Sequence, residues 1–354
     1  LMGDMDIAQT LAEQVSEAAG RGQPMRVSGL DSKAFYGHRV RGELLSLREH
    51  AGITRYEPTE LVISARAGTP IAEIEATLAQ KGQILAFEPP KFDGRASLGG
   101  AVASGLAGPR RPWGGAPRDL MLGMTLLDGR GRILRFGGEV MKNVAGYDLS
   151  RLMAGALGTL GVLLEVSLKV IPAPPVERTL VLKASHDRAL QQMRELARQP
   201  APLSGACHLD ELLYLRLSGN SASVASWERQ IGGESGGGDD FWERLRDQQL
   251  PFFESDRPLW RLSLPPATPR LTCEQHVLTD WAGAQRWVYS SCSAAEIREE
   301  VAKVGGHAIL FRHGDGKTPV FHPLDSVRTR LHRGLKQKFD PSGILNPGRQ
   351  YASI

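Results

Sequence analysis

Three clusters of small residues in the first half of the chain limit its possible folds more than any other feature. They lie at Ser28–Lys33, Leu98–Gly105 and Gly155–Gly161. Glycine inside a helix or strand costs about 0.5–1 kcal/mol, so such clusters predict turns or a close approach of backbone to a ligand. None of them is a Rossmann fingerprint or a P-loop, and the third precedes a strand instead of following one. A nicotinamide or nucleoside-triphosphate site is therefore unsupported, whereas peptide N–H groups facing a pyrophosphate remain an alternative to simple turns.

The segments around these clusters predict an α+β domain. Apolar residues recur at helical spacing over Asp6–Ala19, and a second helix is expected where Thr69 caps and Pro70 takes the first position. Strands are expected at 25–28, 61–65, 83–87, 121–127, 132–136 and 162–170, of which the fourth and fifth form a hairpin. The last strand ends at the proline-rich break Pro172–Pro175, where we place a domain boundary.

The residues after this break predict a second α+β module. Strands are expected at 212–217, 260–264, 286–290 and 307–312, and helices begin at Ser185 and at the capping box Ser293/Glu296. A final helix over Leu324–Phe339 has apolar residues along one face, and we expect it and the following tail to pack back on the first domain. We therefore divide the chain into residues 1–172, 173–320 and 321–354.

The charge balance and the apolar stretches exclude two classes of protein. The chain has 43 Lys and Arg against 39 Asp and Glu, a net charge of +4, which is too small a surplus to predict a nucleic-acid-binding protein. Ala96–Pro109, the longest uncharged stretch, is shorter than the ~20 apolar residues that a membrane-spanning helix needs. The start, LMGDMD, lacks the basic and apolar regions of a secretion signal. We expect a soluble, cytoplasmic protein.

The cysteines provide no metal centre. Cys207, Cys273 and Cys292 lie far apart and no C-x-x-C motif occurs. Neither an iron–sulfur cluster nor a zinc finger can be built from them alone, so no metal site is predicted. Any redox chemistry would need a bound organic cofactor or a partner protein.

The order and spacing of the motifs resemble a known family. The run from Pro24 to Pro172, together with the tail, is similar to the FAD-binding domain of the vanillyl-alcohol-oxidase type flavoproteins, the PCMH-type domain. Within this family the chain resembles the FAD-binding subunits of bacterial glycolate oxidases. The segments that carry this resemblance are EPTELVISARAGTPIAEIEATLAQKG, SLGGAVASGLAGPRRPWGG, GGEVMKNVAGYDLSRLMAGALGTLGVLLEVSLKVIP and FDPSGILNPGR. The resemblance implies an α+β fold in which the PCMH-type domain carries a reduced α+β cap.

The resemblance also implies which residues bind FAD. In the family, the first loop wraps the pyrophosphate and the second cluster forms the second phosphate and ribityl wall. An N-x-x-G-Y-D segment lies near the cofactor, the third cluster meets its adenine side, and the tail returns toward the flavin. The residues at these positions are Ser28, Gly29, Asp31, Ser32 and Lys33, then Leu98, Gly99, Gly100, Ser104 and Gly105, then Asn143, Gly146, Tyr147 and Asp148, then Gly158, Gly161 and Val162, and finally Asn346.

The first loop departs from the family pattern in two ways. Relatives usually have R-G-G-G-[TS] there, whereas this chain has V-S-G-L-D-S. Many relatives also attach FAD covalently through a histidine in this loop. No histidine lies between Pro24 and Ala34, and His38 comes later, so we predict non-covalent FAD.

The candidate catalytic residues are His313 and Arg312. Oxidation of a 2-hydroxy acid requires a base for the hydroxyl proton and a cation for the carboxylate, and arginine suits the second role. Catalytic relatives end their cap with a G-H-x-G-D-G-N-x-H type sequence. This chain has Gly306-His307, then Arg312-His313-Gly-Asp315-Gly, and lacks the Asn and the second His at the right spacing. The pattern does not predict a complete active site within this chain alone.

The resemblance favours one function and leaves two alternatives. It implies an FAD-binding subunit of a glycolate oxidase (glycolate dehydrogenase) complex that oxidises glycolate to glyoxylate, with D-lactate open as another substrate. Partners would be a second, catalytic flavin subunit and an iron–sulfur subunit, and contact with the inner face of the cell membrane would occur only through the complex. The altered first loop favours an alternative, a flavin-free structural subunit that shapes its catalytic partner. A self-sufficient flavin oxidase is the third interpretation.

Overall fold

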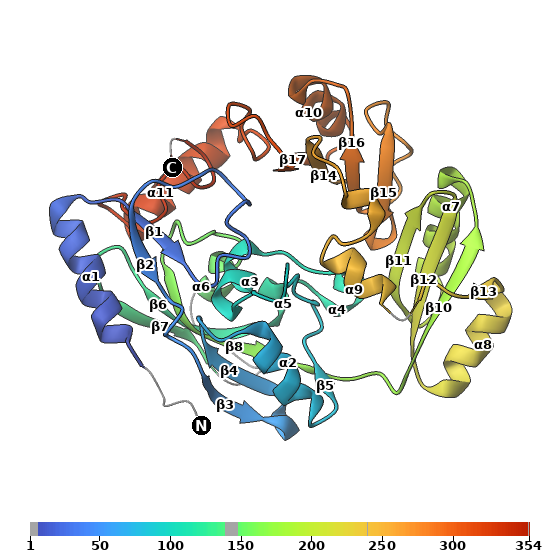
Figure 1. Cartoon of the computed structure of the whole chain (residues 1–354), viewed down its shortest axis with the longest axis horizontal. Coiled ribbons are helices and arrows are strands. Elements are labelled where there is room, and N and C mark those ends of the chain that lie inside the picture. The colour runs from blue at the N-terminus through green and yellow to red at the C-terminus, as the bar shows by residue number, and fades with distance from the viewer. Residues whose placement is uncertain (1–5, 139–147, 239, 353) are drawn as a thin grey trace. The chain divides into compact units, whose positions relative to one another are not determined.

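A computed structural model describes residues 6–138, 148–238, 240–352 and 354. The chain divides into two compact units, each with its own large β-sheet (Figure 1). The first unit comprises Leu1–Ala107, Gly115–Ala173 and Pro323–Ile354, and the second comprises Gly108–Gly114 and Pro174–His322. The mixed helix and strand content agrees with the predicted α+β class.

A five-stranded antiparallel sheet lies at the centre of the first unit. Its strands, in spatial order, are β3 (Ile53–Glu57), β4 (Val62–Arg66), β8 (Val162–Lys169), β6 (Met121–Leu127) and β7 (Ile133–Gly137). The predicted hairpin is confirmed, because β6 pairs with β7 in antiparallel register. Two small sheets accompany it, the parallel pair β1 (Met25–Ser28) and β2 (Glu43–Ser46) and the antiparallel pair β5 (Gln83–Ile84) and β9 (Ile171–Pro172).

Short helices surround this sheet. They are α1 (Ala8–Arg21), the 3-10 turn η1 (Pro58–Glu60), α2 (Ile71–Ala79), α3 (Leu98–Ser104), α5 (Pro117–Leu120), α6 (Leu149–Met153) and α11 (Ser326–Phe339). The helix α3 packs on β4 and β8, and α6 packs on β6 and β7. The loop after β1, the helix α3 and the segment that leads into β8 meet on one side of the unit, where the candidate site lies.

Two local expectations in this unit need correction. Thr69 does not cap α2: its hydroxyl accepts the Gly52 N–H at 2.9 Å and so ties the end of β4 to the loop before β3. The strand expected over 83–87 ends at Ile84, since β9 is only two residues long and offers no further partner.

The glycine-rich segment 96–105 forms a helix in spite of its low helix propensity. Ser97 caps α3, and its Oγ accepts the Gly100 N–H at 3.3 Å. Gly99 allows this helix to pack closely, because a Cβ on Gly99 would lie 2.6 Å from the Cβ of Ala67. The propensity cost is therefore offset by tertiary contact at a position where only glycine fits.

An eight-stranded antiparallel sheet forms the second unit. Its strands, in spatial order, are β13 (Glu234–Ser235), β10 (Val176–Lys183), β12 (Leu212–Gly219), β11 (Leu203–Leu209), β15 (His276–Asp280), β16 (Gln285–Tyr289), β14 (Leu259–Ser263) and β17 (His307–Arg312). Its helical elements are α4 (Arg111–Gly114), α7 (His186–Ala197), α8 (Ser221–Ile231), α9 (Phe241–Arg246), η2 (Pro251–Phe253), η3 (Trp281–Gly283) and α10 (Ala294–Lys303).

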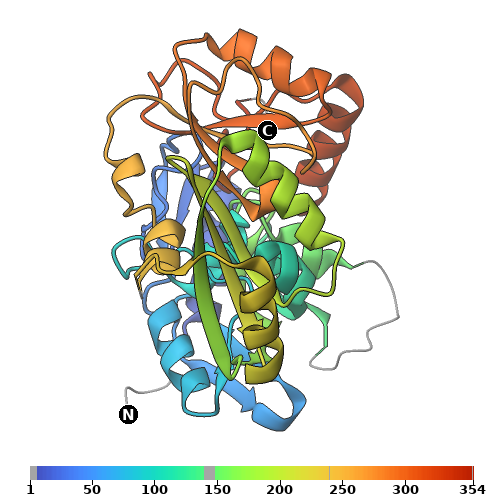
Figure 2. The same cartoon turned by 90° about the vertical axis from the view of Figure 1, so that its right-hand side faces the viewer.

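Two helices cover one end of this sheet. Figure 2 shows α7 and α8 on the same side of strands β10–β12, where Met193 and Val224 join the apolar core. The predicted caps are confirmed: Ser185 caps α7, and in α10 Ser293 and Glu296 bond reciprocally as a capping box.

A buried histidine makes the stability of the second unit dependent on pH. His186 is 6% exposed, its Nε2 lies 3.0 Å from Thr279 Oγ1, and burial, with nearby Arg286 and His208, lowers its pKa to about 4. The unfolded chain would bind a proton near the ordinary pKa of 6.5, before the folded one does. The stabilising contribution is therefore complete above pH 6.5 and is lost as the pH falls toward 4.

We predict that this loss has a slope of up to about 1.4 kcal/mol per pH unit, measured by urea unfolding at several pH values. His186→Gln should flatten the slope, because glutamine does not titrate. His276→Gln, at an exposed histidine, is the control and should leave it unchanged. A slope that persists in His186→Gln would assign the effect to other groups.

Candidate cofactor-binding site

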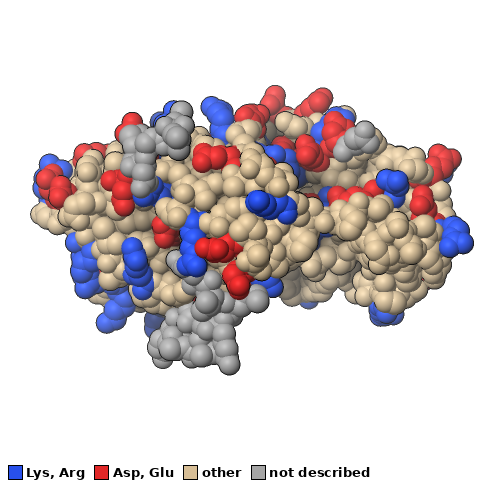
Figure 3. All heavy atoms as spheres, turned by 90° about the horizontal axis from the view of Figure 1, so that it is seen from below, with Lys and Arg blue, Asp and Glu red and all other residues tan. Residues whose placement is uncertain are grey.

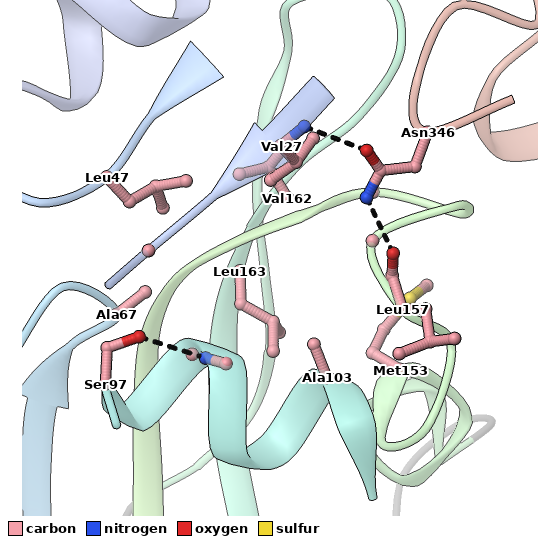
Figure 4. A pocket seen from close by; sticks show the side chains of 15 residues that line it. Val27, Leu47, Ala67, Ser97, Ala103, Met153, Leu157, Val162, Leu163 and Asn346 are labelled. Carbon is pink, nitrogen blue, oxygen red and sulfur yellow. Dashed lines mark hydrogen bonds between the residues drawn. The ribbon is translucent and has the colours of Figure 1, made fainter. Parts of the chain in front are cut away.

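Two adjoining hollows in the first unit form the candidate site. They share the residues Val27, Gly29, Ser97, Gly100, Ala103, Leu157 and Asn346. The first hollow is lined mostly by apolar groups, including Leu47, Met153 and Leu163 (Figure 4). The second is lined by polar and charged groups, including Arg26, Asp31, Ser32, Lys33 and Arg349. An apolar hollow that opens beside a basic one suits a ligand that joins a flat ring system to an anionic group.

Four segments that are distant in the sequence meet at these hollows. The end of β1 provides Val27, and the loop after it provides residues 28–33. The helix α3 forms one wall, and Figure 4 shows Ala103 on it facing the cavity. The third glycine cluster, which leads into β8, and the C-terminal tail complete the lining.

Two glycines keep the lining open at its narrowest points. A Cβ on Gly29 would overlap Ser97 Oγ, which is already engaged as the cap of α3. Gly158 has φ +69°, and a Cβ there would lie 2.9 Å from Asn346 Nδ2. Both positions therefore require glycine, one for space and the other for space and a left-handed backbone.

Asn346 holds the C-terminal tail against two of these segments. Its Oδ1 accepts the Val27 N–H at 2.8 Å, and its Nδ2 donates to Leu157 O at 2.7 Å (Figure 4). The residue is 5% exposed, so both bonds are shielded from water. Asn346 thus fixes the distance between β1 and the third glycine cluster, which sets the width of the apolar hollow.

A buried ion pair supports the same tail, and the sequence analysis did not identify it. Lys336 Nζ lies 2.7 Å from Asp340 Oδ2 and also donates to Thr159 O at 2.8 Å and Leu345 O at 2.7 Å. Asp340 in turn accepts the backbone N–H groups of Ile344 and Leu345. The sequence does place an acidic residue four positions after a lysine at the end of this helix. The several other basic residues of the helix gave no reason to single out Lys336.

The polar hollow has more positive than negative charge. Arg26, Lys33 and Arg349 line it, and Asp31 is the acid among its lining residues. Arg349 Nη2 donates to the carbonyls of Lys33 and Ala34 at 3.1 and 3.2 Å, which joins the tail to the first loop. Asp31 accepts from Ser28 Oγ at 2.6 Å and from Arg26 Nη1 at 3.2 Å. Arg26 and Arg349 were not among the predicted site residues.

Most of the predicted cofactor residues line the two hollows. Those that do are Ser28, Gly29, Asp31, Ser32, Lys33, Gly99, Gly100, Ser104, Gly158, Gly161, Val162 and Asn346. Three others do not: Leu98 is buried in the core, Gly105 ends α3 in a left-handed conformation, and Asp148 is an exposed cap of α6. Asn143, Gly146 and Tyr147 lie outside the described residues.

The two candidate catalytic residues belong to the second unit. Arg312 ends β17 and donates from Nε to Gln248 Oε1 at 2.8 Å. His313 follows it, exposed and with φ +56°. Their role stays a prediction.

The described surface gives no indication of a metal centre or a membrane span. Among residues 6–138, 148–238, 240–352 and 354, no group of three His, Cys, Asp or Glu side chains is placed to hold a metal ion. In the same residues, no helix has both the length and the apolar character to cross a bilayer. Figure 3 shows acidic and basic side chains together on one face of the molecule.

Comparisons with known proteins identify first the class of domain and then the family. The FAD binding domain family matches residues 7–137, which include the first loop and α3. In structure, the chain is similar to alkyldihydroxyacetonephosphate synthase, with a TM-score of 0.66 at 15% identity over 95% of this chain and 74% of that one. The first unit is therefore an FAD-binding domain of the PCMH type, and the chain has the vanillyl-alcohol-oxidase fold.

The sequence relatives narrow the family further. The chain is 48% identical to glycolate oxidase subunit GlcE of Escherichia coli, over 100% of both chains. It is also 31% identical to glycolate oxidase subunit GlcD of Bacillus subtilis over 157 residues, which cover 44% of this chain and 33% of that one. The chain belongs to the family of glycolate oxidase subunit GlcE.

Proposed function

We propose that this chain is the FAD-binding subunit of a multisubunit complex that oxidises glycolate to glyoxylate. The observation that carries the proposal is the pair of adjoining hollows in a chain that matches a glycolate oxidase subunit over its whole length. The partners are a second flavin subunit related to GlcD, which is catalytic, and an iron–sulfur subunit that passes electrons onward. The complex works in the cytoplasm and meets the cell membrane only peripherally.

The residues of the two hollows fit the parts of FAD. Gly29, Gly100 and Gly158 leave backbone accessible, Leu47 and Met153 offer apolar surface to a ring, and Lys33 and Arg349 offer positive charge to phosphates. When bound, FAD supplies a two-electron acceptor for the oxidation of a 2-hydroxy acid. The chain's own residues bind and orient this group. Among the described residues, neither hollow is lined by a histidine, and non-covalent attachment of FAD is part of the proposal.

Arg312 and His313 are the residues of this chain that we assign to the substrate. An arginine fork binds a carboxylate, and a ring nitrogen of histidine can take up the hydroxyl proton of a 2-hydroxy acid. Both roles depend on the partner, since the sequence around them lacks part of the family's catalytic pattern.

The test is anaerobic addition of glycolate to the purified complex and, separately, to the isolated chain. The proposal expects loss of the oxidised flavin absorbance in the complex and little loss in the isolated chain. No loss in the complex would refute it. Rapid loss in the isolated chain would show instead a self-sufficient flavin oxidase.

One observation favours a second function, a flavin-free structural subunit. Asp31 places a carboxylate at the polar hollow, where relatives have glycine, and negative charge opposes phosphate binding. In this alternative the fold serves only to shape the catalytic partner. Asp31→Gly should then have no effect on flavin content, whereas in the FAD-binding subunit it should preserve or raise it.

We further predict that Arg349→Met weakens FAD binding by about 10- to 100-fold, the loss expected for one charge-assisted hydrogen-bonding group. The substitution also removes the two bonds that join the tail to the first loop. Titration of the apoprotein with FAD, followed by flavin fluorescence, measures the change. Arg21→Met, at an exposed arginine paired with Glu43 at 3.8 Å, is the control and should bind FAD as the unmodified chain does.

A further inference from the structure

One face of α11 is exposed although it has the residue pattern of a helix-packing surface. Val327, Leu331, Gly334 and Lys338 follow one another at spacings of four, three and four residues, which is the spacing of a coiled-coil seam. Val327 is 53% exposed and Leu331 is 59% exposed, the two highest values among the exposed large apolar residues of the described chain. We call these four residues the α11 seam. Figure 1 shows α11 in the first unit, beside the C-terminus.

Packing among the described residues does not explain the glycine in this seam. Gly334 lies in the interior of a 14-residue helix, and a Cβ there would meet nothing within 4 Å. Glycine at such a position costs helix stability relative to alanine, so an unused one is unexpected. In helix pairs, a small residue at the seam lets the backbone of a second helix approach closely. The position is therefore explained by a helix that packs on α11 from outside.

The apolar surface continues beyond the helix. Leu335 lies one turn after Leu331 and is half-buried, and it lines a shallow hollow together with Leu152 and Leu160. The hollow adjoins the seam through Leu335, which follows Gly334 on the helix. A helix seated on the seam would have a place beside it for an apolar side chain.

The charges around the seam specify the chemistry of that helix. Arg328, Arg330 and Arg333 are exposed on α11, and Lys338 lies in the seam itself. Asp325 caps the first turn and pairs with Arg328 Nε at 3.5 Å, and Asp340 is buried against Lys336. The charges that face a partner are therefore those of Arg330, Arg333 and Lys338. Arg330 and Arg333, three residues apart, repel each other and weaken the isolated helix. Acidic side chains flanking an apolar stripe would relieve this repulsion and complement the face.

We propose that the α11 seam is the docking site for a partner subunit of the complex, through a helix of that subunit whose apolar stripe is flanked by Asp and Glu. The inference rests on the proposed function, since only a chain that works in a complex needs such a face. It assigns the contact to α11 and leaves the FAD hollows free.

The test compares three variants in co-expression with the GlcD-related flavin subunit and the iron–sulfur subunit of the same organism. Gly334→Leu blocks close approach, and Arg330→Glu reverses a flanking charge. Both should weaken association by about tenfold or more, since the first disrupts the centre of the interface and the second places a like charge against the acidic flank of the partner helix. Gly20→Leu makes the same change at an exposed glycine of α1 where a Cβ also meets nothing, and it should assemble normally.

Two further measurements separate the outcomes. Each isolated variant should keep the FAD content of the unmodified chain, and Gly334→Leu should melt at the same or a higher temperature because leucine favours a helix more than glycine does. A lower melting temperature in Gly334→Leu would mean that the seam packs within the chain, which overturns the inference. Normal assembly of Gly334→Leu would overturn it too, as would self-association of the isolated chain or binding to anionic vesicles that the same variants abolish. Failure of the unmodified chain to assemble would instead refute the proposed function.

Discussion

Replacing Asp340 by alanine should lower the free energy of unfolding by about 3–5 kcal/mol, the range for breaking a buried ion pair. The loss is large because Lys336, which is 8% exposed, would keep its charge without the carboxylate that neutralises it. Burial lowers the pKa of Lys336, and Asp340 opposes that shift. The substitution also removes the acceptor for the N–H groups of Ile344 and Leu345, so the tail before Asn346 would loosen. Urea unfolding followed by circular dichroism measures the change.

Two comparisons show whether the buried charge is the cause. Glu299→Ala breaks another lysine–acid pair four residues apart, with both side chains about 70% exposed, and should cost far less because water screens the pair. The double variant Lys336→Met, Asp340→Ala removes both charges and should recover most of the lost stability. Equal losses in the single and double variants would contradict this explanation and would assign the effect to the backbone bonds.

Replacing Ala103 by tryptophan should abolish stable FAD binding. Ala103 lines both hollows, and Figure 4 shows it facing the cavity, so an indole there would occupy the space between Leu157 and Ser97. We expect the affinity for FAD to fall by roughly 100-fold or more, which corresponds to ~3 kcal/mol. Flavin absorbance of the purified variant and titration with FAD measure the loss.

The matched control is Ala225→Trp, at an exposed alanine of α8 in the second unit. It should retain FAD like the unmodified chain. Far-ultraviolet circular dichroism should show that both variants are folded. Full flavin content in Ala103→Trp would place the cofactor outside the two hollows and contradict the site.

The parts of this structure that follow local rules were predictable from the sequence. The hairpin β6–β7 has alternating apolar residues and a glycine-rich turn. Ser293 and Glu296 have the spacing of a capping box before a helix with an apolar face, and they form one. The three glycine clusters stood out in the sequence because glycine is disfavoured inside helices and strands and is used for turns or for close approach of the backbone to a ligand. The resemblance then predicted half of the residues that line the two hollows.

Features that depend on distant contacts were not predictable in the same way. The glycine-rich α3 forms because Gly99 packs on Ala67, a contact that local propensity does not contain. The final helix was expected to bury its apolar face, but Val327 and Leu331 are exposed and Lys336 is buried instead. A lysine becomes a core residue only when a carboxylate and carbonyls from other segments surround it, as Asp340, Thr159 and Leu345 do here.

The most direct test of the central claim is the flavin content of the isolated chain. The chain is purified without its partners, precipitated with acid, and the supernatant and pellet are analysed separately for FAD. The hollows and the histidine-free first loop predict equimolar FAD, all of it in the supernatant. Colourless protein that does not take up added FAD would contradict an FAD-binding subunit, and flavin that stays in the pellet would contradict non-covalent binding.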